Sequence, residues 1–325
     1  MVRKRIITSR ISLLQWPEPL DRYLAGRFTY LTQDQWRREV ADGRISLDGA
    51  IAADPSTAVA GGEVLAWDGG RIVEPNVDGR ITILYEDEWF VAVNKTGNLP
   101  VHPSGRYFNN TLTALLEERY GRKVYPAHRL DRETSGVILL AFNGKSAGDL
   151  SESLANGSKE YLALVHGYFP DHETIIGLPL GPDPESAVNK KRKAWPGGTQ
   201  KALTRFRKIL TAGEFSLVRC FPETGRLHQI RAHLKSAGFP IVGDKLYGRE
   251  ENAFHEFIRN GFTAELEERL LLPRSALHAA RLVILHPRTR KKMIIRAQLP
   301  EMFADFIRKE KSAHPIRRPG FGLQE

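Results

Sequence analysis

The most informative residues of the chain are His128-Arg129-Leu130-Asp131-Arg132-Glu133-Thr134-Ser135-Gly136. They run directly into six apolar residues, 137–142, a short block that is typical of a fully buried strand. Such a strand anchors the end of the loop to a rigid core, so the loop can position reactive groups. Because Asp131 stands between Arg129 and Arg132, we expect its carboxylate to be held as an anion. Taken alone, an ordinary capped turn with an arginine–aspartate ion pair would explain this loop equally well.

Further along the chain, five segments combine charged, aromatic and small residues. They are Lys159-Glu160-Tyr161-Leu162-Ala163-Leu164-Val165-His166-Gly167, Glu223-Thr224-Gly225-Arg226-Leu227-His228-Gln229-Ile230-Arg231-Ala232-His233-Leu234, Gly243-Asp244-Lys245-Leu246-Tyr247-Gly248, Leu277-His278-Ala279 and Leu285-His286-Pro287. Together with residues 128–136, and in the same order, they resemble the motifs HRLDxxTSG, KxYxAxVxG, TGRxHQIRxHL, GDxxYG, LHA and HP of the RluA-type RNA pseudouridine synthases. An upstream segment, 94–103, resembles the family's NKPxGxxVHP, with Thr96 in place of the proline. This departure concerns the rigidity of a turn and not the chemistry.

The resemblance implies a role for several side chains. Asp131 corresponds to the catalytic aspartate, and Arg231 to the arginine that keeps this carboxylate ionised and directs it with planar donors. Tyr161 corresponds to the ring that lies against the target base. Arg129 is placed to occupy the space that the base leaves when it is flipped out of its stack. The substrate-binding residues expected beside it are Arg132, Lys159, Arg226 and His228.

The implied reaction breaks the bond between the base nitrogen and the anomeric carbon of the sugar, turns the base, and rejoins it through carbon 5. No atoms are gained or lost, so the step is a glycosidic cleavage whose leaving group must be retained, and the resemblance implies an aspartate enzyme without a cofactor. A carboxylate can attack the anomeric carbon or remove a proton from the adjacent sugar carbon. The sequence leaves both routes open.

Composition agrees with an RNA partner. The 325 residues include 48 Lys and Arg against 38 Asp and Glu, and the resulting net charge of +10 attracts polyanions. The single cysteine, Cys220, excludes an intrachain disulfide and a cysteine-cluster zinc site, which suits a reducing cytoplasm. Because no signal peptide and no long apolar stretch are found, we expect a soluble cytoplasmic protein, monomeric and without a membrane partner.

Residues 12–70 predict a small domain of two helices followed by short strands. Thr32 and Gln35 fit a capping box at the start of the second helix, and Gly43 fits a left-handed end of it. Residues 44–49 alternate between polar and apolar side chains, as in a strand, and end in an Asp-Gly turn. This order resembles the alpha-L RNA-binding module found in a small-subunit ribosomal protein and fused ahead of many RluA-type enzymes. If this module binds RNA, Arg37 and Arg38 on the second helix contact phosphate. The alternative is that they form an ordinary solvated helix face.

A turn-rich linker is predicted at 71–79, a catalytic domain at 80–310 and a disordered tail at 311–325. Residues 81–85 and 90–94 indicate a strand hairpin, and helices are expected at 111–120, 145–156 and 226–237. Many strands with few helices favour an α+β class with a mixed, mainly antiparallel sheet.

Other residues invite competing interpretations. His228, His233, His278 and His286 have no cysteine or carboxylate set beside them at ligand spacing, so we expect no metal. The basic run 190–208 is either an RNA-binding lip or a solvated loop. Glu133 stands too close to Asp131 in sequence to form the opposed carboxylate pair of a glycosidase.

These observations predict an enzyme that isomerises uridines of structured RNA, ribosomal RNA or tRNA, to pseudouridine. Two alternatives remain open: a catalytically silent RNA-binding or ribosome-assembly factor on the same fold, and a hydrolase of small nucleosides.

Overall fold

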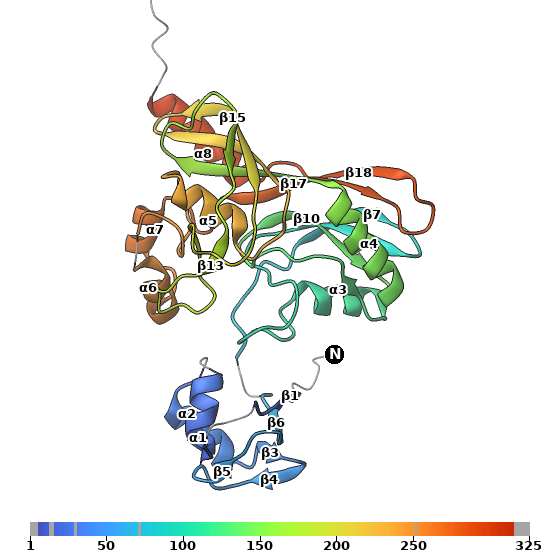
Figure 1. Ribbon diagram of the computed structural model, residues 1–325, viewed down its shortest axis with the longest axis vertical. Helices are drawn as coiled ribbons and strands as arrows, with labels where there is room; N and C mark the ends of the chain where they lie inside the picture. The colour runs from blue at the N-terminus through green and yellow to red at the C-terminus, as the bar shows by residue number, and fades with distance from the viewer. Residues whose placement is uncertain (1–5, 13–15, 29–30, 71–72, 251, 315–325) are drawn as a thin grey trace, which may run out of the picture. The chain divides into compact units, whose positions relative to one another are not determined.

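The computed structural model describes residues 6–12, 16–28, 31–70, 73–250 and 252–314. Their contacts divide the chain into two compact units. In Figure 1 the first unit is coloured mainly blue, and the second runs from cyan to red. The first comprises Met1–Val77 and His102–Arg119, and the second Asp78–Val101 and Tyr120–Glu325. Among the helices that the structure describes, none combines the length and the apolar character of a membrane span.

The first unit is built from short helices and small antiparallel sheets. Its elements are β1 (Ile6–Arg10), β2 (Glu18–Pro19), α1 (Leu20–Arg27), α2 (Gln33–Ala41), β3 (Ile45–Leu47), β4 (Ala50–Ala52), β5 (Ala58–Val59), β6 (Val64–Asp68) and most of α3 (Leu112–Tyr120). The main sheet has the order β1-β6-β3-β4, and β2 pairs with β5. Strand β1, which pairs with β6, lies ahead of residue 12, where the sequence predicts the domain to start.

Local sequence signals of this unit are confirmed. Thr32 and Gln35 form the predicted capping box, and Gly43 follows the helix with a φ of +67°. Asp48 and Gly49 both have positive φ and connect β3 to β4, as a tight Asp-Gly hairpin requires. The core is centred on Trp36, whose ring lies edge-on to that of Trp67 at 4.6 Å.

The second unit contains a large mixed sheet with helices around it. Its elements are β7 (Ile81–Glu86), β8 (Phe90–Lys95), β9 (Tyr125–Pro126), β10 (Ser135–Ala141), α4 (Gly144–Asn156), β11 (Ser158–His166), β12 (Thr174–Ile176), β13 (Leu180–Pro182), β14 (Arg192–Ala194), β15 (Thr204–Ala212), β16 (Phe215–Pro222), α5 (Gln229–Ser236), α6 (Ala253–Asn260), α7 (Ala264–Leu270), β17 (Leu277–Leu285), β18 (Lys292–Arg296) and α8 (Glu301–Ala313).

The sheet follows the order β12-β15-β16-β11-β17-β10-β8-β7, with β18 added to β17 and β9 to β10. Its neighbours pair antiparallel, except that β10 and β17 run parallel. This confirms the predicted α+β class with a mixed, mainly antiparallel sheet. The predicted hairpin is β7–β8, and the strand predicted at 137–142 is β10, which is buried along its whole length.

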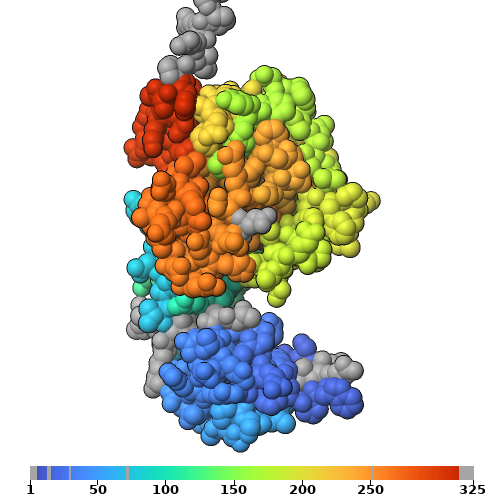
Figure 2. Space-filling model, turned by 90° about the vertical axis from the view of Figure 1, so that its left-hand side faces the viewer, coloured from blue at the N-terminus to red at the C-terminus, as the bar shows by residue number. Residues whose placement is uncertain are grey.

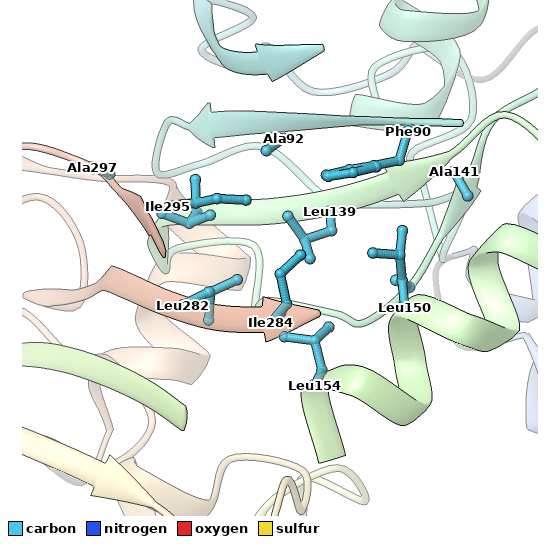
Figure 3. Close-up of a cluster of buried hydrophobic side chains, with 12 residues drawn as sticks. Phe90, Ala92, Leu139, Ala141, Leu150, Leu154, Leu282, Ile284, Ile295 and Ala297 are labelled. Carbon is cyan, nitrogen blue, oxygen red and sulfur yellow. The ribbon is translucent and has the colours of Figure 1, made fainter. Parts of the chain in front are cut away.

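The hydrophobic core beneath this strand fixes the loop that precedes it. Leu139 of β10 packs between Phe90 of β8 and Ile284 of β17, while Leu150 and Leu154 of α4 close the layer (Figure 3). A fully buried side chain of this size contributes about 1.5–3 kcal/mol to folding. The loop 128–134 therefore enters a part of the molecule that resists deformation.

The two faces of the sheet carry different elements. Phe206, Cys220 and Tyr161 are successive cross-strand partners, so they share one face, which we call the active-site face. Helix α5 covers it, because Gln229 and His233 both bond to Thr204 on the same face. We call the opposite side the outer face. Helix α8 covers part of it, with Phe303 against His278 and Phe306 against Phe215.

Two predicted boundaries differ from the structure. The helix predicted at 226–237 begins only at Gln229, because His228 has a left-handed φ of 57° that a helix cannot continue. The tail predicted from residue 311 is helical as far as Ala313, and residues 315–325 lie outside the described residues. Helices α3 and α4 match their predictions within one residue.

The parallel pairing of β10 and β17 requires a glycine at its start. Gly136 has a φ of +112° and lies opposite Ala279, and a Cβ there would be 2.2 Å from the carbonyl oxygen of Ala279. Gly136→Ala should therefore destabilise the protein by about 2 kcal/mol or more, as measured by urea unfolding. Gly148→Ala is the matched control, because this exposed α4 glycine has open space around it and should gain roughly 0.5–1 kcal/mol. Equal stability of the two variants would refute this account of the junction.

Candidate active site

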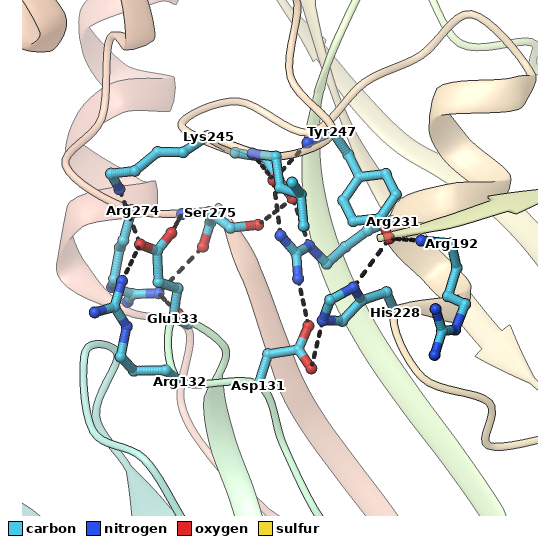
Figure 4. A network of polar contacts seen from close by, with 12 residues as sticks. Asp131, Arg132, Glu133, Arg192, His228, Arg231, Lys245, Tyr247, Arg274 and Ser275 are labelled. Atoms are coloured by element: carbon cyan, nitrogen blue, oxygen red, sulfur yellow. Dashed lines mark hydrogen bonds and ion pairs between the residues drawn. The ribbon is translucent and has the colours of Figure 1, made fainter. Parts of the chain in front are cut away.

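The carboxylate of Asp131 joins Arg231 and His228 in the polar network of Figure 4. Its side chain is 25% exposed, and its Oδ2 accepts a hydrogen bond of 2.7 Å from Nη1 of Arg231. The structure thus brings together two residues that are 100 positions apart in sequence. The arginines that flank Asp131 in sequence behave differently: Arg132 forms its ion pair with Glu133, and Arg129 is exposed.

Arg231 is itself held by a second carboxylate. Its Nε donates to Oδ2 of Asp244 at 2.6 Å and its Nη2 to Oδ1 at 2.9 Å, a two-bond fork that fixes the plane of the guanidinium. Asp244 is fully buried and also accepts from the backbone amides of Leu246 and Tyr247. Burial alone would raise the pKa of Asp244, but the charge of Arg231 and these donors lower it to about 2. Arg231 consequently presents its remaining Nη1 edge to Asp131.

His228 faces the other oxygen of Asp131. The Oη of Tyr247 accepts from the backbone amide of Arg192 at 2.7 Å and lies 2.9 Å from Nδ1 of His228. If the tyrosine hydroxyl donates to Nδ1, the imidazole hydrogen is on Nε2. That Nε2 is 3.8 Å from Oδ1 of Asp131. Burial, with the nearby arginine charges, lowers the pKa of His228 to about 4, so the ring is neutral at neutral pH.

Tyr161 is buried on the active-site face, in the centre of β11. Burial first, and then the negative charge of Asp131, raise its pKa above the ordinary tyrosine value. The phenol is therefore protonated and within the electrostatic reach of the carboxylate. These two residues and Arg231, which we predicted to act together, do lie in one region.

Lys95 supports the loop from below, and sequence reasoning missed it as a functional residue. Its fully buried Nζ donates to the carbonyl oxygens of Thr96 and Leu99 at 2.8 Å and of Arg132 at 3.1 Å. Burial, with the charge of Arg274, lowers the pKa of Lys95 to about 7. A buried lysine at the end of the apolar strand 90–95 was the available signal. Thr96, the departure from the family motif, donates its hydroxyl to the carbonyl oxygen of Asp78, a bond that proline could not make.

Glu133 ties the other side of the loop to the segment before β17. It accepts from Nζ of Lys245 at 2.9 Å, from Nη2 of Arg132 at 3.1 Å and from the amide of Ser275 at 3.1 Å. Arg274 adds a bond from Nη1 to the carbonyl oxygen of Glu133. Because its charge is satisfied internally, Glu133 is a structural carboxylate, as the sequence argument against a glycosidase pair expected.

The remaining predicted substrate-binding residues are distributed around the site and beyond it. Lys159 is half-buried, and burial lowers its pKa. Arg226 is exposed just ahead of α5 and donates to the carbonyl oxygen of Lys201. Arg37 and Arg38 belong to the first unit, where Arg37 pairs with Asp21 and Asp34 while Arg38 is exposed.

The histidines that might suggest a metal each have a separate place. His233 bonds to Thr204 and to the carbonyl oxygen of Leu178, His278 lies 3.0 Å from Oγ of Ser135, and His286 lies 2.6 Å from Oδ2 of Asp87. Within the described ranges, no three potential ligands gather at one point.

Known proteins share this fold and these motifs. A family model described as RNA pseudouridylate synthase matches residues 89–236. The chain is 36% identical over 221 residues to tRNA pseudouridine(32) synthase, mitochondrial, of Saccharomyces cerevisiae. The alignment covers 67% of this chain and 48% of the yeast protein. It is 31% identical over 300 residues to Ribosomal large subunit pseudouridine synthase D of Zymomonas mobilis, covering 87% and 90% respectively.

A solved structure of human RNA Pseudouridylate Synthase Domain Containing 1 superposes with a TM-score of 0.55 at 27% identity, over 71% of this chain and 90% of the human one. The fold and the likenesses together define the class as that of the RNA pseudouridine synthases. Within this class, the chain belongs to the RluA-type family. It spans about half the length of the yeast relative and nearly all of the Zymomonas one.

The fork between Asp244 and Arg231 yields a prediction. Asp244→Asn keeps the side-chain shape but removes the charge that fixes the guanidinium, so turnover on RNA should fall at least about tenfold while RNA affinity is retained. Stability should fall by about 3 kcal/mol, since the buried arginine keeps only one carboxylate. Asp305→Asn on α8 is the control, because its exposed pair with Arg308 is worth about 0–1 kcal/mol. Wild-type turnover by folded Asp244→Asn protein would contradict the proposed support.

Proposed function

We propose that the chain converts uridines of structured RNA to pseudouridine, with Asp131 as the catalytic residue and without a cofactor. The observation that carries this proposal is the state of the Asp131 carboxylate. One of its oxygens is bound by Arg231, while the other faces only the distant Nε2 of His228 among the contacts described. A partly exposed carboxylate with one oriented and one open oxygen suits attack on a sugar carbon or abstraction of a sugar proton.

The chemistry balances without any further reactant. The bond from the base nitrogen to the anomeric carbon breaks, and the bond from carbon 5 to that carbon forms. Carbon 5 loses its hydrogen as a proton, and the freed nitrogen binds one. The detached base must stay in the site while it turns, so a side chain has to hold it there and exclude water. The buried ring of Tyr161 supplies such a wall on the active-site face.

The target uridine has to leave its stack to reach this carboxylate, at a cost of a few kcal/mol. Arg129 is exposed at the start of the same loop, two residues before Asp131, which supports a role in filling the vacated space. Arg132 is oriented toward Glu133 and the ring of Phe257. We therefore assign Arg132 to the support of the loop as well as to the RNA.

The basic run 190–208 is divided between two places. Its first part forms β14 of the β13–β14 hairpin, beside the active site through the bond from Arg192 to Tyr247. Its last part belongs to β15. In Figure 2 the yellow-green hairpin region and the orange α6–α7 region lie on either side of the segment that contains α5. We propose that the hairpin contacts the RNA next to the flipped nucleotide.

Relatives named for large-subunit ribosomal RNA and for tRNA support these two RNA classes as substrates. The enzyme is proposed to act in the cytoplasm, because its single buried cysteine suits a reducing compartment, and to act as a monomer. The first unit is proposed to add sequence-independent phosphate contacts, with Arg38 as the best candidate, since it is exposed while Arg37 is engaged with Asp21.

Asp131→Asn tests the catalytic assignment. The amide keeps the volume and removes the nucleophile or base, so pseudouridine formation should fall below detection in total RNA incubated with purified protein. RNA affinity should remain within about twofold, because phosphate contacts are untouched. Pseudouridine formed by this variant would overturn the assignment. Wild-type protein that binds RNA and forms no pseudouridine would instead favour the silent RNA-binding alternative.

Arg38→Glu tests the first unit. The change should weaken RNA binding and reduce the slope of log K against log salt by about 0.9 for each duplex phosphate that is no longer neutralised, with turnover at saturating RNA unchanged. Lys309→Glu, at an exposed position of α8, makes the same change of charge as a control. If both variants bind RNA with one affinity and one salt slope, the first unit makes no specific phosphate contact through Arg38.

A further inference from the structure

Four arginines from neighbouring strands lie on the outer face of the large sheet. Arg207 of β15 is directly opposite Arg219 of β16, and Arg281 of β17 is directly opposite Arg296 of β18. Glu160 of β11 lies between the two pairs and is the cross-strand partner of Arg281. We call this set the outer arginine strip. It crosses β15, β16, β11, β17 and β18, and four strand spacings of about 4.8 Å give it a length of about 19 Å.

The contacts of Glu160 show that the arginines share one side. Its Oε1 is 2.9 Å from Nε of Arg219, and its Oε2 is 4.0 Å from Nη1 of Arg281. One carboxylate therefore serves two guanidinium groups. Arg207 and Arg296 are exposed, and their side chains form no ion pair with any residue that the structure describes. Four positive charges and one negative charge leave the strip with a net charge of +3.

Such an arrangement is unfavourable for the protein alone. Like charges directly opposite one another on adjacent strands destabilise a sheet, and the strip contains two such pairs. Helix α8 covers the outer face at His278 and Phe215, whereas Arg207 and Arg296 are exposed. A bound polyanion would neutralise both pairs at once.

We propose that the outer arginine strip is a second RNA-binding surface, which holds the phosphate backbone of an RNA segment remote from the target uridine. The proposal rests on the proposed function, because it takes RNA as the partner. Arginine forks match phosphate geometry, and a strip of this length can meet several successive phosphates. Because the active site lies on the opposite face, this surface favours large folded RNA over a short stem-loop.

The test compares Arg207→Gln/Arg296→Gln with wild-type protein in the full-length chain. The probe is a fluorescent duplex RNA of arbitrary sequence, several helical turns long, titrated between about 50 and 200 mM salt. We expect the salt slope to fall by about 0.9 for each phosphate that the variant no longer neutralises, and the affinity to fall with it. Lys145→Gln/Arg288→Gln removes the same charge from exposed positions on α4 and after β17, and should change neither quantity.

A second readout distinguishes binding from a structural role. If the arginines serve RNA, Arg207→Gln should leave the melting temperature of the free protein unchanged or raised, since it relieves a like-charge pair. Turnover of both double variants at saturating RNA should equal that of wild type. Unchanged affinity and salt slope in Arg207→Gln/Arg296→Gln would overturn the proposal and leave an acidic protein as the partner of the strip. Failure of the proposed function would differ, because wild-type protein would then make no pseudouridine at all.

Discussion

The rest of the site depends on one interaction, the two-bond fork between Asp244 and Arg231. An arginine buried to this degree needs a carboxylate partner, and Asp244 meets that need from a fully buried position. The guanidinium is thereby fixed before any substrate arrives. Its third nitrogen then aligns Asp131, whose open oxygen faces the reaction space. Orientation of this kind lowers a barrier because its entropic cost has already been met during folding.

The scaffold holds both ends of this arrangement. Asp131 precedes β10, whose buried strand and parallel pairing with β17 leave the loop little freedom. Lys95 and Glu133 bind the loop from two sides, the first through carbonyl oxygens and the second through Lys245. Arg231 comes from α5, which is attached to the same sheet by the bonds of Gln229 and His233 to Thr204. A reactive carboxylate is thus positioned from a sheet and a helix rather than by a mobile loop alone.

The sequence predicted what depends on local patterns. The capping box at Thr32, the Asp-Gly hairpin at residues 48 and 49, the buried strand after Gly136 and helices α3 and α4 follow from short-range chemistry and are confirmed. The family motifs named Asp131, Tyr161 and Arg231, and the structure brings these residues into one region.

What the sequence missed depends on long-range contacts. The arginines beside Asp131 suggested a local partner, and only the resemblance to the family pointed to Arg231, which lies 100 positions away and binds the carboxylate. The predicted helix is shortened by the left-handed backbone of His228. The side chain of this residue contacts the hydroxyl of Tyr247, which comes from a different segment of the chain. Strand β1 was not predicted, because its five residues are only modestly hydrophobic and form a strand by pairing with β6. The outer arginine strip exists only through strand register, which the sequence does not display.

A double-mutant cycle on turnover shows whether Asp244 acts through Arg231. It compares wild type, Arg231→Lys, Asp244→Asn and the double variant on one RNA at saturation. Because lysine cannot form the planar fork, the double variant should lose little more activity than the less active of the two single variants. Such non-additive losses would show that the two sites are strongly coupled. If the two losses instead multiplied as independent effects, the fork would not be what orients the guanidinium toward Asp131.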